Sequence, residues 1–263
     1  MQVLEKGFYT GKIMRQMRNN GIFINTVQYA LEDPNPGDHY HLNPHICFLL
    51  LGSDKEKRHG KVYARNGGDI FFYRAGEAHE TVERNHLVKS IVIELDSSFI
   101  NKYDLTESQL ELAITNTHKL KFTLLKTLKE LEYNESCNAN LSIEMLLLNL
   151  FSQTKILNTA PQWLLKVKAY LHDNWNNTVS LEELAIIANV HPVTISTYFS
   201  KFHEETLSEY MRKIKIEHSL SLIKNSAISL TEIAYSCGFA DQSHFVRCFK
   251  HCTGLLPKEF RKL

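Results

Sequence analysis

The sequence has few cysteines and no long apolar run. Its five cysteines are odd in number and include no Cys-x-x-Cys pair, so neither a disulfide framework nor a zinc finger is indicated. No run approaches the roughly eighteen apolar residues that a membrane-spanning helix needs, and the first residues lack the apolar core of a signal peptide. We therefore expect a cytoplasmic protein with no membrane partner.

An excess of charge of one sign is also lacking. Thirty Lys and Arg residues against 29 Asp and Glu residues give a formal net charge of +1. Non-specific affinity for DNA scales with the number of phosphates that a protein neutralises, so we expect it to be modest here. At 263 residues, the chain is long enough for two domains that each bury a core.

A repeated segment marks the last third of the chain. Residues 180–185 (SLEELA) return 49 positions later as residues 229–234 (SLTEIA). Each copy begins with Ser-x-x-Glu, the reciprocal cap of a helix start, and a turn and a second amphipathic segment follow. The pattern predicts two helix-turn-helix units, at about 180–202 and 229–252.

The second helix of each unit is predicted to bury aromatic residues and to turn a polar face outward. Ile195, Phe199 and Phe202 form the inward stripe of the first, and Phe245 and Phe249 that of the second. Arg and Gln side chains can hydrogen-bond base edges, and Val can contact a thymine methyl group; the alternative is an ordinary solvated helix face. We expect base contacts from Val193, Thr194, Ser196, Thr197, Gln242, Ser243, Val246 and Arg247, and phosphate contacts from Lys201, Arg212 and Lys250.

These residues carry a family resemblance. Residues 233–250 (IAYSCGFADQSHFVRCFK), followed by Gly254, Pro257 and Phe260, closely resemble the pattern of the AraC family of regulators. The resemblance implies an all-α DNA-binding domain over 161–263 with double-stranded DNA as its partner. In such proteins a long helix joins the two units, and residues 211–224 are the candidate.

The departures from that family pattern fall at helix ends. Glu204 stands where the first unit usually has Gly, Leu256 stands where Ser or Thr usually precedes the proline, and His191 replaces the usual Ser or Thr cap. The buried aliphatic and aromatic positions all remain, so we expect the fold to be kept.

The first hundred residues are predicted to be β structure. Apolar residues alternate or run in short blocks, as at 46–51, 70–73 and 88–95, and turns with glycines separate the blocks. Such spacing is typical of hairpins stacked as a small barrel or sandwich. We expect a jelly-roll barrel over residues 1–100.

Two segments of this region resemble the motifs of the cupin superfamily. Residues 68–79 (GDIFFYRAGEAH) are similar to the second motif, and His39, His41, His45 and Gly52 reproduce the spacing of the first, with His45 where Glu is usual. The resemblance implies a sensor barrel and would bring His39, His41, His45 and His79 to the four places where metal-binding cupins hold their ion.

We favour a ligand pocket without metal over a metal site for these four histidines. Sensor barrels of AraC-like regulators have generally lost the metal. His39, His41 and His45 would share one face of a strand, but Pro44 threatens the regularity of that strand. No cofactor is therefore expected. The predicted pocket residues are His39, His41, His45, Phe72 and His79.

Residues 108–158 switch to a helical period. Over 101–158 we expect a helical segment that either forms a dimer interface, as in AraC-like sensors, or covers the barrel of its own chain; both alternatives stay open. Residues 157–161 are the expected domain boundary, with Pro161 opening the next helix.

The sequence thus predicts an α+β protein of two domains: a cupin-like barrel with following helices, then two helix-turn-helix units joined by a long helix. Its predicted function is that of a ligand-responsive transcription regulator that acts as a homodimer. Activation is the more common outcome among such proteins, and an activator would also engage RNA polymerase. The alternatives are a metal-dependent cupin enzyme with an accessory tail and a regulator without an effector.

Overall fold

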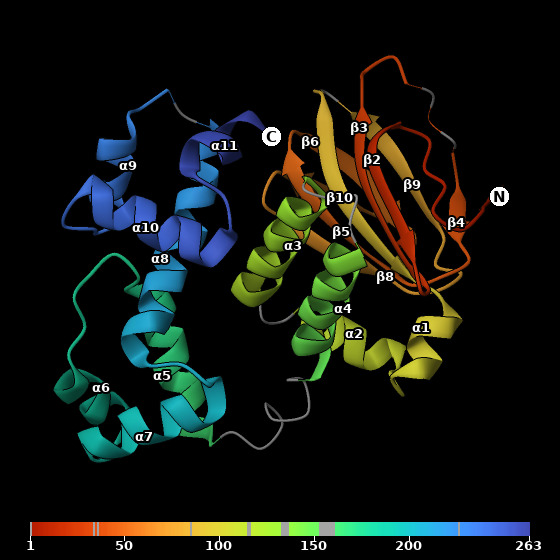
Figure 1. Cartoon of the computed structure of the whole chain (residues 1–263). Coiled ribbons are helices and arrows are strands. Elements are labelled where there is room, and N and C mark those ends of the chain that lie inside the picture. Colours follow the sequence, from red (N-terminus) through yellow and green to blue (C-terminus); the bar gives the residue numbers. More distant parts are fainter. Residues whose placement is uncertain are drawn as a thin grey trace. The chain divides into compact units, whose positions relative to one another are not determined.

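The computed structural model (Figure 1) describes residues 2–263 except 34, 36, 85, 115–116, 133–136, 153–160 and 226. The chain divides into two compact units, Met1–Phe151 with Leu263, and Ser152–Lys262. The expected boundary at 157–161 lies outside the described residues except for Pro161. Among the described helices, none combines the length and apolar character needed to cross a membrane.

The first unit begins with strands, as predicted. In the described part, ten strands form two five-stranded sheets with the orders β1-β4-β9-β6-β7 and β2-β3-β10-β5-β8. The strands are β1 (Gln2–Leu4), β2 (Lys12–Asn19), β3 (Ile22–Tyr29), β4 (His39–His41), β5 (His45–Leu51), β6 (Ser53–Arg58), β7 (Lys61–Asn66), β8 (Ile70–Tyr73), β9 (His79–Arg84) and β10 (Val88–Leu95).

The second sheet has two faces of different character. Register pairs Ile93 of β10 with Ile24 and Ile46, and Ile46 in turn with Phe72, so these side chains share one apolar face. Successive side chains of a strand point to opposite faces. The other face therefore carries their neighbours, including His45, Cys47, Tyr73 and Ser90, and it is this face that lines a pocket.

Four helices follow the strands in this unit: α1 (Ser97–Lys102), α2 (Glu107–Ala113), α3 (Thr117–Glu132) and α4 (Cys137–Ser152). Asp96 caps α1 by accepting hydrogen bonds from the backbone of Ser98 and Phe99. Helix α3 packs against β2. The apolar period predicted here is observed in the buried residues Leu120, Leu124, Leu128 and Leu131 of α3 and Ile143, Leu147, Leu150 and Phe151 of α4.

The described part of the second unit is helical. It comprises α5 (Gln162–Asp173), α6 (Leu181–Ala188), α7 (Pro192–His203), α8 (Leu207–Asn225), α9 (Leu230–Ser236), α10 (Gln242–Thr253) and α11 (Pro257–Lys262). The core around α5, α6 and α7 is built by Leu164, Val167, Leu171, Leu184, Ile195, Phe199, Tyr210 and Ile214.

Helix α8 is the long connection between the two helix-turn-helix units, and it contacts α7, α9, α10 and α11. It is longer than predicted because it begins at Leu207 rather than at Met211. The backbone N–H of Thr206 donates to the Glu209 carboxylate at 2.8 Å, and the N–H of Glu209 donates to the Thr206 hydroxyl at 3.2 Å. This reciprocal cap fixes the earlier start.

Candidate nucleic-acid interface and sandwich pocket

Helices α6 and α7 form the first helix-turn-helix unit. Ser180 caps α6 by accepting from the N–H of Glu183 at 3.1 Å, but the Glu183 carboxylate accepts from the Tyr170 hydroxyl. Of the two hydrogen bonds of the reciprocal cap expected here, the structure thus describes only the one accepted by the Ser180 side chain. Asn189 ends α6 in the left-handed region, and His191 caps α7 through its ring nitrogen.

The inward stripe of α7 differs in one position from the prediction. Ile195 and Phe199 are fully buried, whereas Phe202 is only half-buried and His203 takes the third buried place. Phe199 and His203 lie four residues apart, on one face of the helix, and both rings contact Tyr210. Sequence reasoning missed His203 because a histidine is not counted in an apolar stripe.

The outward face of α7 carries the predicted base-contacting residues. Val193 is 62% exposed, Thr197 is exposed, and Thr194 and Ser196 are half-buried. The Ser196 hydroxyl donates to the Val193 carbonyl at 3.0 Å. Lys201 is exposed, with its ammonium group 5.7 Å from the centre of the Tyr198 ring.

Helices α9 and α10 form the second unit. Ser229 and Glu232 complete a reciprocal cap on α9, and Gly238 makes the turn with a φ of 68°. Asp241 caps α10 by accepting from the N–H of His244 at 2.7 Å. Phe245 and Phe249 are fully buried, as predicted from their spacing.

The outward face of α10 exposes Gln242, Ser243, Arg247 and Lys250, while Val246 is half-buried. The Gln242 side-chain oxygen accepts a 2.5 Å hydrogen bond from the Thr231 hydroxyl. This contact orients the side chain, because an amide whose oxygen is engaged presents its NH₂ group elsewhere.

Arg212, predicted to contact phosphate, lies half-buried on α8. It lines a hollow of about 380 Å³ together with Arg247, Glu204 and Glu209. The two arginines therefore lie beside acidic residues within this unit, and Arg212 is less accessible than Lys201 or Lys250.

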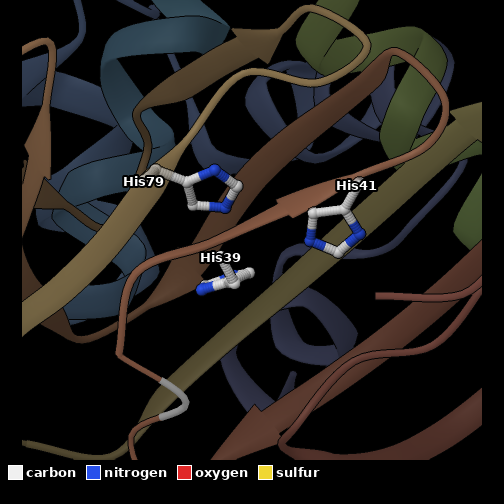
Figure 2. Close-up of side chains that lie close together, drawn as sticks. All are labelled: His39, His41 and His79. Carbon is white, nitrogen blue, oxygen red and sulfur yellow. The ribbon is translucent and has the colours of Figure 1, made fainter. Parts of the chain in front are cut away.

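The sandwich of the first unit holds the four predicted histidines in one pocket. His39 and His41 lie on β4, His79 on β9 and His45 on β5, and all four are buried. Pro44 lies between β4 and β5, so the first three histidines belong to two strands in different sheets and not to the single strand considered from sequence. Figure 2 shows the rings of His39, His41 and His79 pointing into the same space.

Burial keeps these imidazoles neutral. It lowers the pKa of His41 and of His79 to about 3, lowers the pKa of His39, and holds the pKa of His45 well below its usual value. The neighbouring histidines lower the pKa values of His41, His45 and His79 further. Neutral imidazole is the form that binds metal ions.

Three of the histidines have a donor set that fits a metal ion. His39, His41 and His79 each offer one ring nitrogen, and these atoms lie within 4.8 Å of one another. Two nitrogens on one tetrahedral zinc ion are about 3.4 Å apart, given Zn–N bonds of about 2.1 Å. Small side-chain rotations would close that difference.

The other end of the pocket holds an ionic network that the sequence did not predict. Arg65 donates two hydrogen bonds of 2.7 Å to Asp54, and it also pairs with Glu56 and with the Tyr73 hydroxyl. Arg65 and both carboxylates are buried. The alternation of Asp54 and Glu56 on β6 was the available signal, since it places both on one face of that strand.

Phe72 was predicted to line the pocket, and this is wrong. Tyr73, its neighbour on β8, lines the pocket instead. Phe72 pairs with Ile46 on the apolar face of the second sheet, and the strand's alternation turns Tyr73 to the opposite side. The cavity between the sheets measures about 60 Å³.

Comparison with known proteins identifies the second unit. Residues 184–263 match the family model of a helix-turn-helix domain. The HTH-type transcriptional regulator YijO of Escherichia coli (strain K12) is 27% identical over 53% of this chain and 51% of its own length. The transcriptional activator RhaS of Enterobacter sp. (strain 638) is 21% identical over 86% of this chain and 87% of its own.

Among solved structures, ToxT from Vibrio cholerae aligns with 92% of this chain and 98% of its own at 13% identity, with a TM-score of 0.38. The chain spans about half the length of YijO and 29% of GbdR from Pseudomonas aeruginosa, another HTH-type regulator that it matches. The second unit is an AraC-type helix-turn-helix domain. Over this domain the chain is similar to transcription regulators of the AraC type.

Proposed function

We propose that the protein is a sequence-specific DNA-binding transcription regulator, with α7 and α10 entering successive major grooves of one duplex. The observation that carries this proposal is the presence of two capped helix-turn-helix units whose second helices turn exposed polar faces outward. Helices of this kind read base edges with residues near their amino-terminal ends. Base contacts are assigned to the outward residues of α7 and α10, and phosphate contacts to Lys201, Lys250 and Arg212.

Arg247→Ala tests the base-contact assignment. Removing a bidentate contact to guanine should weaken binding to the preferred site by about 1–3 kcal/mol, roughly 5- to 150-fold in Kd, and should relax the preference at one base pair. Selection of binding sites from a random DNA pool, followed by anisotropy titration, measures both effects. Lys166→Ala is the matched control because it removes an exposed positive charge from α5.

An unchanged base preference in Arg247→Ala would refute the role of Arg247. If Lys166→Ala also lost the preference at that base pair, net charge, and not the outward face of α10, would determine specificity. Lys250→Ala should weaken binding to all sequences alike, because a phosphate contact carries no sequence information.

The pocket of the first unit is the proposed effector site, and its size limits the ligand. A cavity of about 60 Å³ is far smaller than the roughly 300–1,000 Å³ of pockets for drug-sized ligands. The lining is rich in polar and charged groups. Both features support a small polar effector over a fatty acid, an aromatic compound or a sugar. The alternative that these features also allow is a regulator without an organic effector.

Dimerisation and contact with RNA polymerase belong to the same proposal. Helix α4 exposes Leu141 and Met145, each at 61%, while it buries its other face, which supports a homodimer through this helix. A relative named as a transcriptional activator, RhaS, favours activation, which requires contact with RNA polymerase. Light scattering at micromolar concentration tests the dimer, because a monomer there would exclude it.

A further inference from the structure

Two of the pocket histidines are held by a close contact of one ring nitrogen with a backbone carbonyl group, whereas the contact of His45 with the Asn43 carbonyl is longer, at 3.5 Å. Nδ1 of His39 lies 2.9 Å from the carbonyl oxygen of Gly37, and Nδ1 of His79 lies 3.0 Å from that of Glu77. A carbonyl oxygen only accepts, so each Nδ1 carries the hydrogen and each Nε2 keeps its lone pair. This arrangement is the one that orients histidines bound to a metal.

These two histidines face each other across paired strands, since His39 of β4 is in register with His79 of β9. Their ring centres are 4.4 Å apart. The third histidine, His41, is 3% exposed, and its Nδ1 has no hydrogen-bond partner among the described residues. A buried polar atom without a partner costs about 1–3 kcal/mol, which calls for a ligand that protein atoms do not supply.

His45 lies beside His41, with ring centres 4.4 Å apart, but it differs from the other three in the strand that carries it. It lies on β5, in the other sheet, and its ring stacks on Tyr73 with a centre separation of 4.5 Å and an interplanar angle of 5°. The group of ring nitrogens within 4.8 Å of one another contains His39, His41 and His79 without it. The cupin resemblance implied four ligands, and the structure brings three together.

The carboxylates that line the pocket or contact its lining are engaged elsewhere. Asp54 and Glu56 pair with Arg65, and Glu94 accepts hydrogen bonds from Asn43 and from the Tyr9 hydroxyl. A site built from neutral imidazoles without a carboxylate suits zinc, cobalt, nickel or copper, whereas magnesium and calcium prefer oxygen ligands. The volume of about 60 Å³ suits an ion with a bound water molecule.

We propose that His39, His41 and His79 bind one divalent ion of a late first-row transition metal, and that His45 is not a ligand. Three protein ligands leave a coordination position open for water or for a small effector. Metal binding as such is independent of the proposed function. Only the binding of a small effector at the open position rests on that function.

The test uses the 263-residue chain without a histidine tag, freed of metal by a chelator and then titrated with Zn²⁺ and with Co²⁺. We expect one ion per chain, visible absorption bands of four-coordinate Co²⁺, and a melting temperature of the first unit that rises with Zn²⁺ concentration by mass action. Failure of the wild-type protein to bind either ion at micromolar concentration would overturn the proposal.

Glutamine variants identify the ligands. His39→Gln, His41→Gln and His79→Gln should each lower Zn²⁺ affinity by at least about tenfold, whereas His45→Gln should change it by less than about threefold. His86→Gln is the matched control, because His86 is an exposed histidine of the same unit. Loss of affinity in His45→Gln as large as in His39→Gln, or an equal loss in His86→Gln, would contradict the three-ligand assignment.

A measurement on the unmutated protein covers the case in which a variant does not fold. In the NMR spectrum of the Co²⁺ form, the exchangeable imidazole N–H signals with the large contact shifts of rings bonded to the metal should come from no more than three histidines. Signals from four would overturn the exclusion of His45. DNA affinity with and without Zn²⁺ is measured separately: metal binding without DNA binding would refute the proposed function alone, and DNA binding without metal binding would refute this inference alone.

Discussion

Glu204→Gly should stabilise the second unit. Glu204 ends α7 with a φ of 57°, in the left-handed region. Gly254 holds the equivalent place at the end of α10 with a φ of 77°. A residue with a Cβ atom destabilises the folded state by about 1–2 kcal/mol in that conformation. Glycine removes this strain, but the greater freedom of the unfolded glycine chain offsets roughly 0.5–1 kcal/mol of the gain. The net gain should be about 0.5–1 kcal/mol.

The cap itself is kept in this variant, because the backbone N–H at position 204 bonds to the Ser200 carbonyl at 2.9 Å. The assay is urea unfolding followed by tryptophan fluorescence. The two tryptophans of the chain, Trp163 and Trp175, both lie in the second unit, so the signal reports this unit alone. The transition midpoint should rise by roughly 0.2–1 M for an m-value of 1–3 kcal/mol per M.

Glu204→Ala is the control that separates backbone strain from loss of the carboxylate. Alanine keeps the Cβ atom, so the unfavourable φ remains and the midpoint should not rise. An equal rise in the alanine and glycine variants would show that the carboxylate, and not the backbone, is the source of the effect. No rise in Glu204→Gly would refute the argument.

Three further substitutions test the stability of particular contacts. Arg65→Ala should destabilise the first unit by about 3–5 kcal/mol, since it leaves two buried carboxylates without their partner; urea unfolding followed by far-UV circular dichroism should show this with the tryptophan transition unchanged. Ser229→Ala should lower the free energy of unfolding of the second unit by about 1–2 kcal/mol, and Ser180→Ala should lower it by about half of that. The difference is expected because only Ser229 is described with a complete reciprocal cap. Equal losses of stability in urea unfolding followed by tryptophan fluorescence would contradict this. Gly52→Ala should destabilise the first unit by roughly 2 kcal/mol or more, because a Cβ there would lie 2.1 Å from the Leu87 carbonyl oxygen at a φ of +87°; a variant that melts like wild type would contradict it.

The helix-turn-helix units could be predicted because their signals are local. Caps such as Ser229 and Asp241, and buried stripes such as Phe245 with Phe249, act over a single helix and can be read from spacing. Where the prediction differed, a tertiary contact was responsible. His203 is buried because it meets Tyr210 on the next helix, and α8 starts early because Thr206 and Glu209 cap each other.

The pocket was harder to predict because its parts come from different strands. Residues 39, 41, 45 and 79 could be grouped by the cupin resemblance, but spacing did not reveal that Pro44 divides them between two sheets. The choice between Phe72 and Tyr73 depends on which face of β8 meets the pocket, and a run of three aromatic residues has no alternation from which to decide. The Arg65 network joins β6 and β7 of one sheet to β8 of the other, a combination set only by how the two sheets pack together.

The polar interior of the sandwich points to a functional constraint on the first unit. A β-sandwich gains stability from apolar inner faces, yet here one side of the second sheet packs Ile24, Ile46 and Ile93 while the other faces histidines and a buried ion-pair network. Buried ion pairs are seldom more stable than apolar residues of the same volume. Arg65 donates a hydrogen bond to the Tyr73 hydroxyl, which in turn donates to the Glu56 carboxylate, and Tyr73 stacks on His45. The network therefore fixes the position of the Tyr73 ring, which contacts both His45 and His79, so its effect is on the geometry of the pocket more than on the stability of the fold.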